Sequence, residues 1–131
     1  MRQITEHQVN KANEQLEIFV EDDPIPFGAS SRYLITGFNA FTNAAYTPES
    51  VDQDSITILF QNGSISETGV NGITHEALIA IILDRLRAFQ DGQFKCRENA
   101  LAITKLEEAQ HWLLHRTNKR LARGVEGTHQ I

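Results

Sequence analysis

A basic run near the C-terminus is the group of residues best suited to bind an anion. Its members are His115, Arg116, Lys119, Arg120 and Arg123. Arg116 and Arg120 are four residues apart, so they share one face of a helix. Two guanidinium groups on one face suit a pyrophosphate or two neighbouring phosphates, because each can donate two parallel hydrogen bonds. The same cations would also stabilise a helix C-terminus without any ligand, and the spacing alone leaves both interpretations open.

Asn99 lies on the same predicted helical stripe as these arginines. At 1.5 Å of rise per residue, Asn99 and Arg116 would be about 25 Å apart along the helix. A small ligand cannot reach both within one chain. If both bind one ligand, Asn99 must come from one subunit and the arginines from another, which predicts a site at a dimer interface. The alternative is that Asn99 only caps or solvates the first helical turn.

Two aromatic residues could stack on a nucleotide base. Phe89 ends a predicted helix beside the turn formed by residues 90–92, and an exposed ring there could stack. Its place on the apolar stripe of that helix fits a core residue equally well. Trp112 is amphipathic and fits helix packing better than ligand stacking.

No set of residues with the spacing of a catalytic or metal site stands out. His111 and His115 are four apart and could hold zinc, but the motif His-Trp-Leu-Leu-His lacks the Glu of a metalloprotease helix. The pair Glu107-Glu108 fits a solvated helix surface, and Cys96 has no evident base partner. We therefore expect no catalytic residue, no bound metal and no cofactor.

The elements that must position these residues change type half-way along the chain. The first half favours short strands, predicted from alternating or β-branched segments at residues 16–21, 32–38, 55–60 and 65–68. Asn62-Gly63 is a strong hairpin signal, so we expect antiparallel pairing there. Residues 39–54 are rich in Asn, Thr, Ser and Asp and predict a loop.

The second half favours two helices. The first helix is predicted to begin after Thr74, a suitable N-cap, and to end at Asp91-Gly92. A longer helix is predicted from about Arg97 to Arg123, stopped by Gly124. The short link between them predicts an antiparallel helical hairpin. The fold class is therefore α+β, with a β-rich half (1–72) and a helical hairpin (73–131) forming one compact domain.

Composition limits the function classes. The chain has 131 residues, a formal net charge of −5 and a single cysteine. A general DNA or RNA binder would carry a basic surface, so the charge argues against one. One cysteine allows no intrachain disulfide and fits a reducing cytoplasm. The N-terminus is polar and the most apolar stretch is short, so we expect a protein with no membrane segment. A core this small would benefit from oligomerisation.

The sequence resembles the Thoeris anti-defence sponges, a viral family that shares a helical hairpin with the anti-CBASS sponges. The resemblance is most specific over residues 94–128, and its marks include Arg97-Glu98-Asn99, Leu106-Glu107-Glu108-Ala109, Trp112-Leu113, Arg116-Thr117, Arg120 and residues 123–128. It continues upstream through Gly69 to Ala77 and Asp84-Arg85-Leu86, and more weakly into Arg32-Tyr33-Leu34-Ile35.

This resemblance implies a function. Family members bind a cyclised ADP-ribose signal of bacterial immunity without cleaving it, at sites shared between subunits. Carried over by position, the site residues are Phe89 and Asn99 from one chain and Arg116 and Arg120 from its partner. The expected ligand is glycocyclic ADP-ribose, with cyclic oligonucleotides of CBASS as a further possibility. The expected assembly is a homo-oligomer, either a dimer or a hexamer built as a trimer of dimers, in the cytoplasm of the infected host.

Three further expectations accompany this interpretation. Arg32 and Tyr33 are candidate contacts in the β-rich half, because they are polar and lie in a predicted strand near a turn. A different function would be hydrolysis of the same signal, using His111, His115 or Glu108. A third would be a phage structural protein whose basic helix binds a protein partner.

Overall fold

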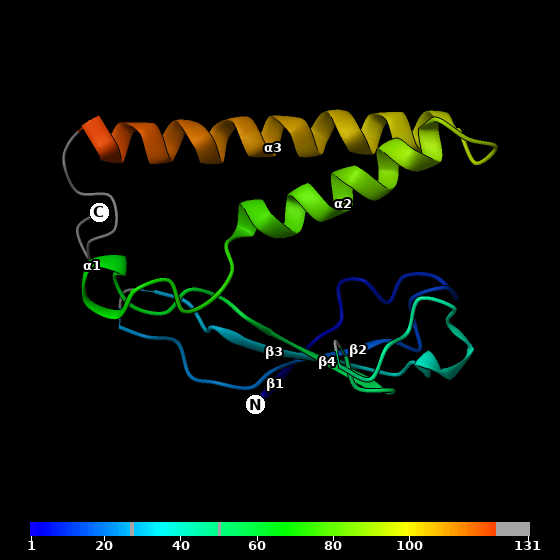
Figure 1. Ribbon diagram of the computed structural model, residues 1–131, viewed down its shortest axis with the longest axis horizontal. Coiled ribbons are helices and arrows are strands. Elements are labelled where there is room, and N and C mark those ends of the chain that lie inside the picture. The colour runs from blue at the N-terminus through cyan, green and yellow to red at the C-terminus, as the bar shows by residue number, and fades with distance from the viewer. Residues whose placement is uncertain (27, 50, 123–131) are drawn as a thin grey trace. The chain divides into compact units, whose positions relative to one another are not determined.

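The computed structural model describes residues 1–26, 28–49 and 51–122. Contacts divide the chain into two compact units: the first is Met1–Phe60, and the second begins at Gln61. The predicted α+β class is confirmed, because an antiparallel sheet is followed by C-terminal helices (Figure 1). None of the helices within the described ranges is long and apolar enough to cross a bilayer.

The first unit is a four-stranded sheet. Its strands are β1 (Arg2–Ile4), β2 (Glu17–Val20), β3 (Arg32–Thr36) and β4 (Ser55–Leu59), and each pairs antiparallel with the next in the order β1-β2-β3-β4. The strands predicted at 16–21, 32–38 and 55–60 are confirmed with slightly shorter bounds. β1 was not predicted. Its three residues are too few for a periodic pattern, and its pairing with β2 defines it.

Few side chains of this sheet are buried. Val20 at the end of β2 is 2% exposed, and Ala40 in the short 3-10 helix η1 (Ala40–Thr42) is 7% exposed. The Tyr33 ring on β3 meets the Phe60 ring edge-on at 5.6 Å between centroids. η1 begins at Asn39, whose side chain accepts the Phe41 N–H. The segment predicted as a loop therefore contains one helical turn.

Gly37 allows the chain to turn after β3. Its φ is +91°, which L side chains rarely adopt. A Cβ at this position would collide with the backbone carbonyl oxygen of Gln15. The Gln15 side chain in turn donates to the Gly37 carbonyl at 2.9 Å. Glycine is therefore required where these two segments touch.

The strand predicted at residues 65–68 is wrong, and so is the antiparallel hairpin expected at Asn62-Gly63. Gly63 has φ +92°, as the Asn-Gly turn requires, but the chain then enters the helix α1 (Ile65–Thr68). The Thr68 hydroxyl donates to the Ser64 carbonyl at 2.9 Å, which closes this turn locally. Side-chain hydrogen bonds of this kind offer the backbone an alternative to a strand ladder.

The second unit carries the predicted helical hairpin, α2 (His75–Gln90) and α3 (Arg97–Ala122). The Thr74 side chain accepts the Ala77 N–H at 3.1 Å, so the predicted N-cap is confirmed. Leu83, 4% exposed, is the buried apolar side chain of α2. The Gln110 amide of α3 also donates to the Glu76 carbonyl at 3.1 Å. The end predicted for α3, at Arg123 and Gly124, lies outside the described residues.

Candidate functional site

The turn between α2 and α3 brings two exposed aromatic rings together. Phe89 is in the last turn of α2 and 37% exposed, and Phe94 in the link is 64% exposed. Their ring centroids are 5.8 Å apart, and the planes are tilted by 57°. Phe89 is therefore not a fully buried core residue in this chain. Its partly open ring has the character that stacking on a base requires.

Asn99 is held close to this pair by hydrogen bonds of the same turn. Its side-chain amide donates to the Phe94 carbonyl at 3.4 Å, and its backbone N–H points to the Cys96 sulfur at 3.4 Å. Cys96 is itself fixed, because its N–H donates to the Gln90 side chain at 2.9 Å. The Asn99 side-chain oxygen accepts no hydrogen bond from the described residues, so it is available to a ligand. The alternative interpretation, a residue of the first turn, also agrees with these contacts.

Arg116 and Arg120 lie at the opposite end of α3. The helix is unbroken between Asn99 and Arg116, so the separation of about 25 Å expected from helical rise applies. The Arg116 side chain is exposed, whereas Arg120 is buried, with 9% exposed. The structure therefore brings Phe89 and Asn99 together in one chain and places the two arginines far from them.

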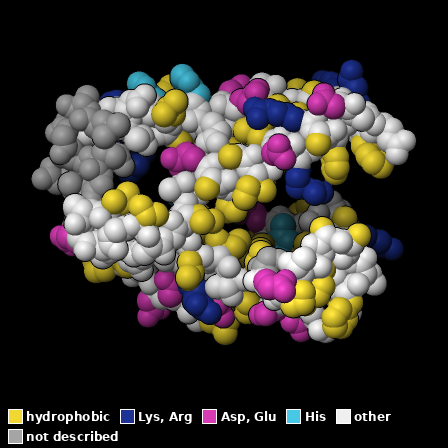
Figure 2. All heavy atoms as spheres, viewed as in Figure 1, with side chains coloured by type: hydrophobic (Ala, Val, Ile, Leu, Met, Phe, Trp, Pro, Cys, Tyr) yellow, Lys and Arg dark blue, Asp and Glu magenta, His cyan; other side chains and the backbone are white. Residues whose placement is uncertain are grey.

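The histidines of α3 form an aromatic cluster with Trp112 on the solvent-exposed face of the helix. The rings of His111 and His115 are stacked at 6.5 Å, and Trp112 meets both edge-on at 5.4 and 5.7 Å. Trp112 is 65% exposed, so it does not serve the helix packing expected of it. Figure 2 shows histidine side chains (cyan) at the surface near the C-terminal end of α3. Within the described ranges, no group of three or more metal-ligating side chains comes together.

Glu108, considered for hydrolysis, lies 3.9 Å from Lys105 one turn earlier on the exposed surface of α3. Glu107 is paired with Arg87 of α2 at 3.0 Å. These contacts are those of a solvated helix face, as the sequence suggested. Neither carboxylate is recorded in contact with a histidine of the described residues.

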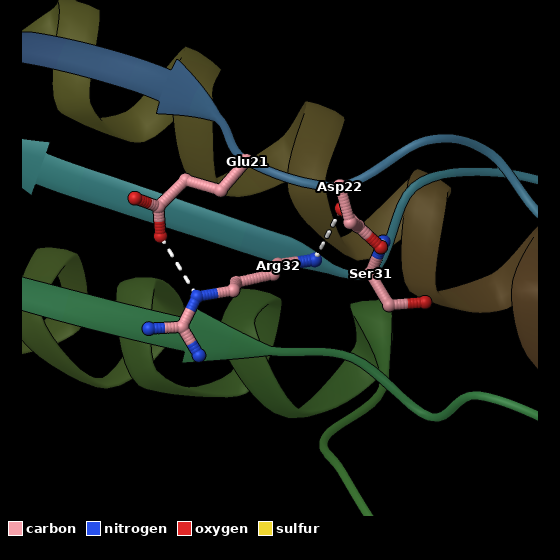
Figure 3. A network of polar contacts seen from close by, with 4 residues as sticks. All are labelled: Glu21, Asp22, Ser31 and Arg32. Atoms are coloured by element: carbon pink, nitrogen blue, oxygen red, sulfur yellow. Dashed lines mark hydrogen bonds and ion pairs between the residues drawn. The ribbon is translucent and has the colours of Figure 1, made fainter. Parts of the chain in front are cut away.

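In the sheet, the candidates Arg32 and Tyr33 lie at the start of β3. The Arg32 guanidinium pairs with Glu21 at 2.8 Å, while the Asp22 carboxylate accepts the N–H groups of Arg32 and Ser31 at 2.9 and 2.8 Å (Figure 3). These hydrogen bonds, that from Arg32 first, lower the pKa of Asp22 below its ordinary value of 3.8. Arg32 is thus engaged in fixing the loop between β2 and β3.

A further hollow lies in the first unit. It has a volume of about 620 Å³ and belongs to the segment around η1, where it is lined by Phe38, Asn39, Ala40, Thr42, Asn43, Ala44, Ala45, Tyr46 and Val51. None of these side chains carries a charge. Phosphate recognition needs cations or converging N–H donors, so this hollow does not compete with the helical hairpin as an anion site.

Three positioning residues were missed by sequence reasoning. Phe94 and Gln90 act through the conformation of the link, which sequence spacing does not reveal. Arg85 lies over the Phe89 ring, with its guanidinium carbon 5.3 Å from the centroid. The signal for Arg85 was present, because residues four apart on a helix are neighbours.

Comparison with known proteins gives two matches. The chain is 57% identical over 74 residues to a protein of Bacillus phage SBSphiJ7 named Thoeris anti-defense 1. The match covers 56% of this chain and 52% of the relative, so the chain spans about half the length of that relative. The family description "Acb2/Tad1, hairpin domain" matches residues 52–118. This range covers α1, α2 and most of α3, including all the contacts that place Phe89 and Asn99. Because the match extends over just over half of its length, the chain belongs to the Acb2/Tad1 hairpin family.

Proposed function

We propose that this protein is a viral anti-defence sponge that binds glycocyclic ADP-ribose without cleaving it and so blocks Thoeris immunity. Its membership of the hairpin family and its similarity to a phage protein named Thoeris anti-defense 1 support an anti-defence role. The observation that carries the ligand assignment is the separation of complementary groups. A stacking ring and an amide lie at one end of the hairpin, and two arginines lie at the other.

The proposed site forms between two subunits. In a two-fold dimer, any contact from one chain to its partner is repeated in the reverse direction. Two hairpins packed antiparallel across the two-fold axis would bring Phe89 and Asn99 of each chain to Arg116 and Arg120 of the other. This arrangement yields two equivalent sites and accounts for an intrachain separation of about 25 Å.

Each group matches a part of the ligand. The arginines would neutralise the pyrophosphate, where bidentate hydrogen bonds are strongest. The Phe89 ring would stack on the adenine, worth roughly 1–3 kcal/mol by analogy with single-strand binders. Asn99 offers both donors and an acceptor to the base edge or the ribose hydroxyls. A sponge must compete with a sensitive receptor, so we expect a Kd in the nanomolar range. This Kd corresponds to a binding free energy of about −12 kcal/mol.

The test is calorimetric titration of the purified protein with glycocyclic ADP-ribose, followed by heat denaturation and chromatography of the released ligand. Tight binding near one ligand per chain, with the ligand recovered intact, would support the sponge. Recovery of a linear product would instead establish a hydrolase. If no binding occurs, the ligand assignment is wrong, and cyclic di- and trinucleotides of CBASS become the next ligands to titrate.

A further inference from the structure

Arg85 is placed where it can serve the proposed site. It comes one turn before Phe89 on α2, and its guanidinium carbon lies over the Phe89 ring, 5.3 Å from the centroid. The side chain is exposed. Within the described residues, the Arg85 side chain contacts this ring and forms no ion pair with a carboxylate.

The other arginine of α2, Arg87, has a different partner. Arg87 is also exposed, but its guanidinium is committed to Glu107 on α3 at 3.0 Å. Arg87 therefore joins the two helices, whereas the polar contact of Arg85 within the described residues is with the ring that we propose to bind the base. A cation held by a ring, rather than by a carboxylate, keeps its full charge available to an anion.

The hydrogen-bonding groups of Arg85 are not used by the described residues, because the ring is the contact that its guanidinium makes there. A guanidinium carries five N–H donors. A ligand that stacks on Phe89 would therefore find these donors beside the ring. Arg120 is 9% exposed, so an exposed cation at the Phe89 end would add to the phosphate contacts proposed for Arg116 and Arg120.

We propose that Arg85 is a further ligand-binding residue, which orients the Phe89 ring and donates to a phosphate of the ligand from the same chain as that ring. The proposal rests on the proposed function and deepens it. It makes the Phe89 end of the hairpin a combined base and phosphate site, suited to an anionic nucleotide rather than to a nucleoside.

The experiment titrates glycocyclic ADP-ribose into wild type and four variants: Arg85→Ala, Arg85→Met, Arg85→Lys and the matched control Arg87→Ala. We expect Arg85→Ala to weaken binding by roughly 10- to 100-fold, as for loss of a charged hydrogen bond, and Arg87→Ala to change it by less than about twofold. Met retains an apolar contact with the ring but has no charge, so Arg85→Met should bind as weakly as Arg85→Ala. Lys restores the charge and should recover part of the affinity.

Two results would overturn the phosphate role. If Arg85→Met binds like wild type, Arg85 only supports the ring. If Arg85→Ala and Arg87→Ala weaken binding equally, the effect is one of general charge. Added salt should also reduce the affinity of wild type more steeply than that of Arg85→Met, because one ionic contact is missing in the variant.

A wrong ligand assignment can be distinguished from a wrong role for Arg85. If wild type does not bind glycocyclic ADP-ribose, NMR titrations with ADP and with adenosine test Arg85 directly. A shift of the Arg85 side-chain N–H signal with ADP but not with adenosine would uphold the inference and reject only the sponge ligand. No shift with either probe would reject both.

Discussion

Asn99 and Arg116 lie on one unbroken helix, α3, with about 25 Å of helix axis between them. The distance exceeds the reach of one small nucleotide, so within a single chain these side chains cannot share such a ligand. A site that uses both must be completed by a second copy of the chain. This relationship leads to the most direct test of the proposed assembly.

Mixed oligomers of two variants that bind weakly or not at all should regain tight binding sites. Asn99→Trp fills the site on one chain, and Arg116→Ala removes the phosphate contact on the other. In a hybrid dimer, one of the two sites pairs wild-type Asn99 with wild-type Arg116. Random mixing of equal amounts should therefore restore about a quarter of the sites, because half of the dimers are hybrids with one intact site each. Calorimetric titration of the co-refolded mixture counts the sites, and an absence of recovery would argue for a site within one chain.

Arg116→Ala alone should weaken binding by roughly 10- to 150-fold while the oligomer persists. The exposed Arg116 side chain has no recorded role in helix packing, and a charged hydrogen bond to phosphate is worth roughly 1.5–3 kcal/mol. Lys105→Ala is the control, since it removes an equal charge from the middle of the same helix. Titration and light scattering would measure affinity and assembly in parallel. Normal binding by Arg116→Ala would mean that the pyrophosphate assignment is wrong.

Thr74→Ala should destabilise the helical hairpin by about 1 kcal/mol, because the Ala77 N–H loses its acceptor at the start of α2. Thr104 is the matched control. Its hydroxyl donates to the Ala100 carbonyl in the interior of α3, where alanine has the higher helix propensity. Thr104→Ala should therefore leave stability unchanged or raise it slightly. Urea unfolding followed by circular dichroism compares the two, and equal losses would refute the capping role.

Acid should weaken the loop between β2 and β3 through Asp22. The pKa of Asp22 is lowered in the folded protein, chiefly by the N–H groups of Arg32 and Ser31. A group whose folded pKa lies below its unfolded value contributes stability above the unfolded pKa and loses it as pH falls through the folded pKa. The loss should therefore begin near the ordinary value of 3.8 and continue below it.

Asp22→Asn should remove this part of the pH dependence, since the amide does not titrate. The measurement is the thermal midpoint of wild type and variant from about pH 6 to about pH 3, together with the NMR titration of the Asp22 carboxyl carbon. An Asp22 midpoint at or above the ordinary 3.8 would contradict the hydrogen-bonding account.

The regular elements could be predicted from the sequence because their causes are local. Alternation of apolar residues defines β2, and Thr74 marks the start of α2. The error at Ile65–Thr68 has a different origin. Gln61 and Asn71 hydrogen-bond across this segment, with Asn71 donating to the Asn62 carbonyl at 2.7 Å and Gln61 to the Gly69 carbonyl at 2.9 Å. Such side-chain bonds depend on a loop conformation that periodicity does not describe.

The candidate site also combines features with local causes and features that depend on the tertiary fold. The family resemblance indicated Phe89 and Asn99, whereas the separation of Asn99 from the arginines follows from helical rise. The placement of Asn99 against Phe94, and the bond from Cys96 to Gln90, depend on the fold of a six-residue link between α2 and α3. The burial of Arg120 likewise depends on tertiary contacts rather than on its position in the basic run.

The neighbour-to-neighbour order of the sheet has a kinetic consequence. Every strand pairs with the one that follows it in the chain, and α2 packs on α3 directly after it. The connections between paired strands hold 12, 11 and 18 residues (5–16, 21–31 and 37–54), but none of them spans another described strand. Folding rates rise as native contacts become more local in sequence. Stopped-flow refolding should accordingly be complete within about milliseconds, in the range of domains with local contacts.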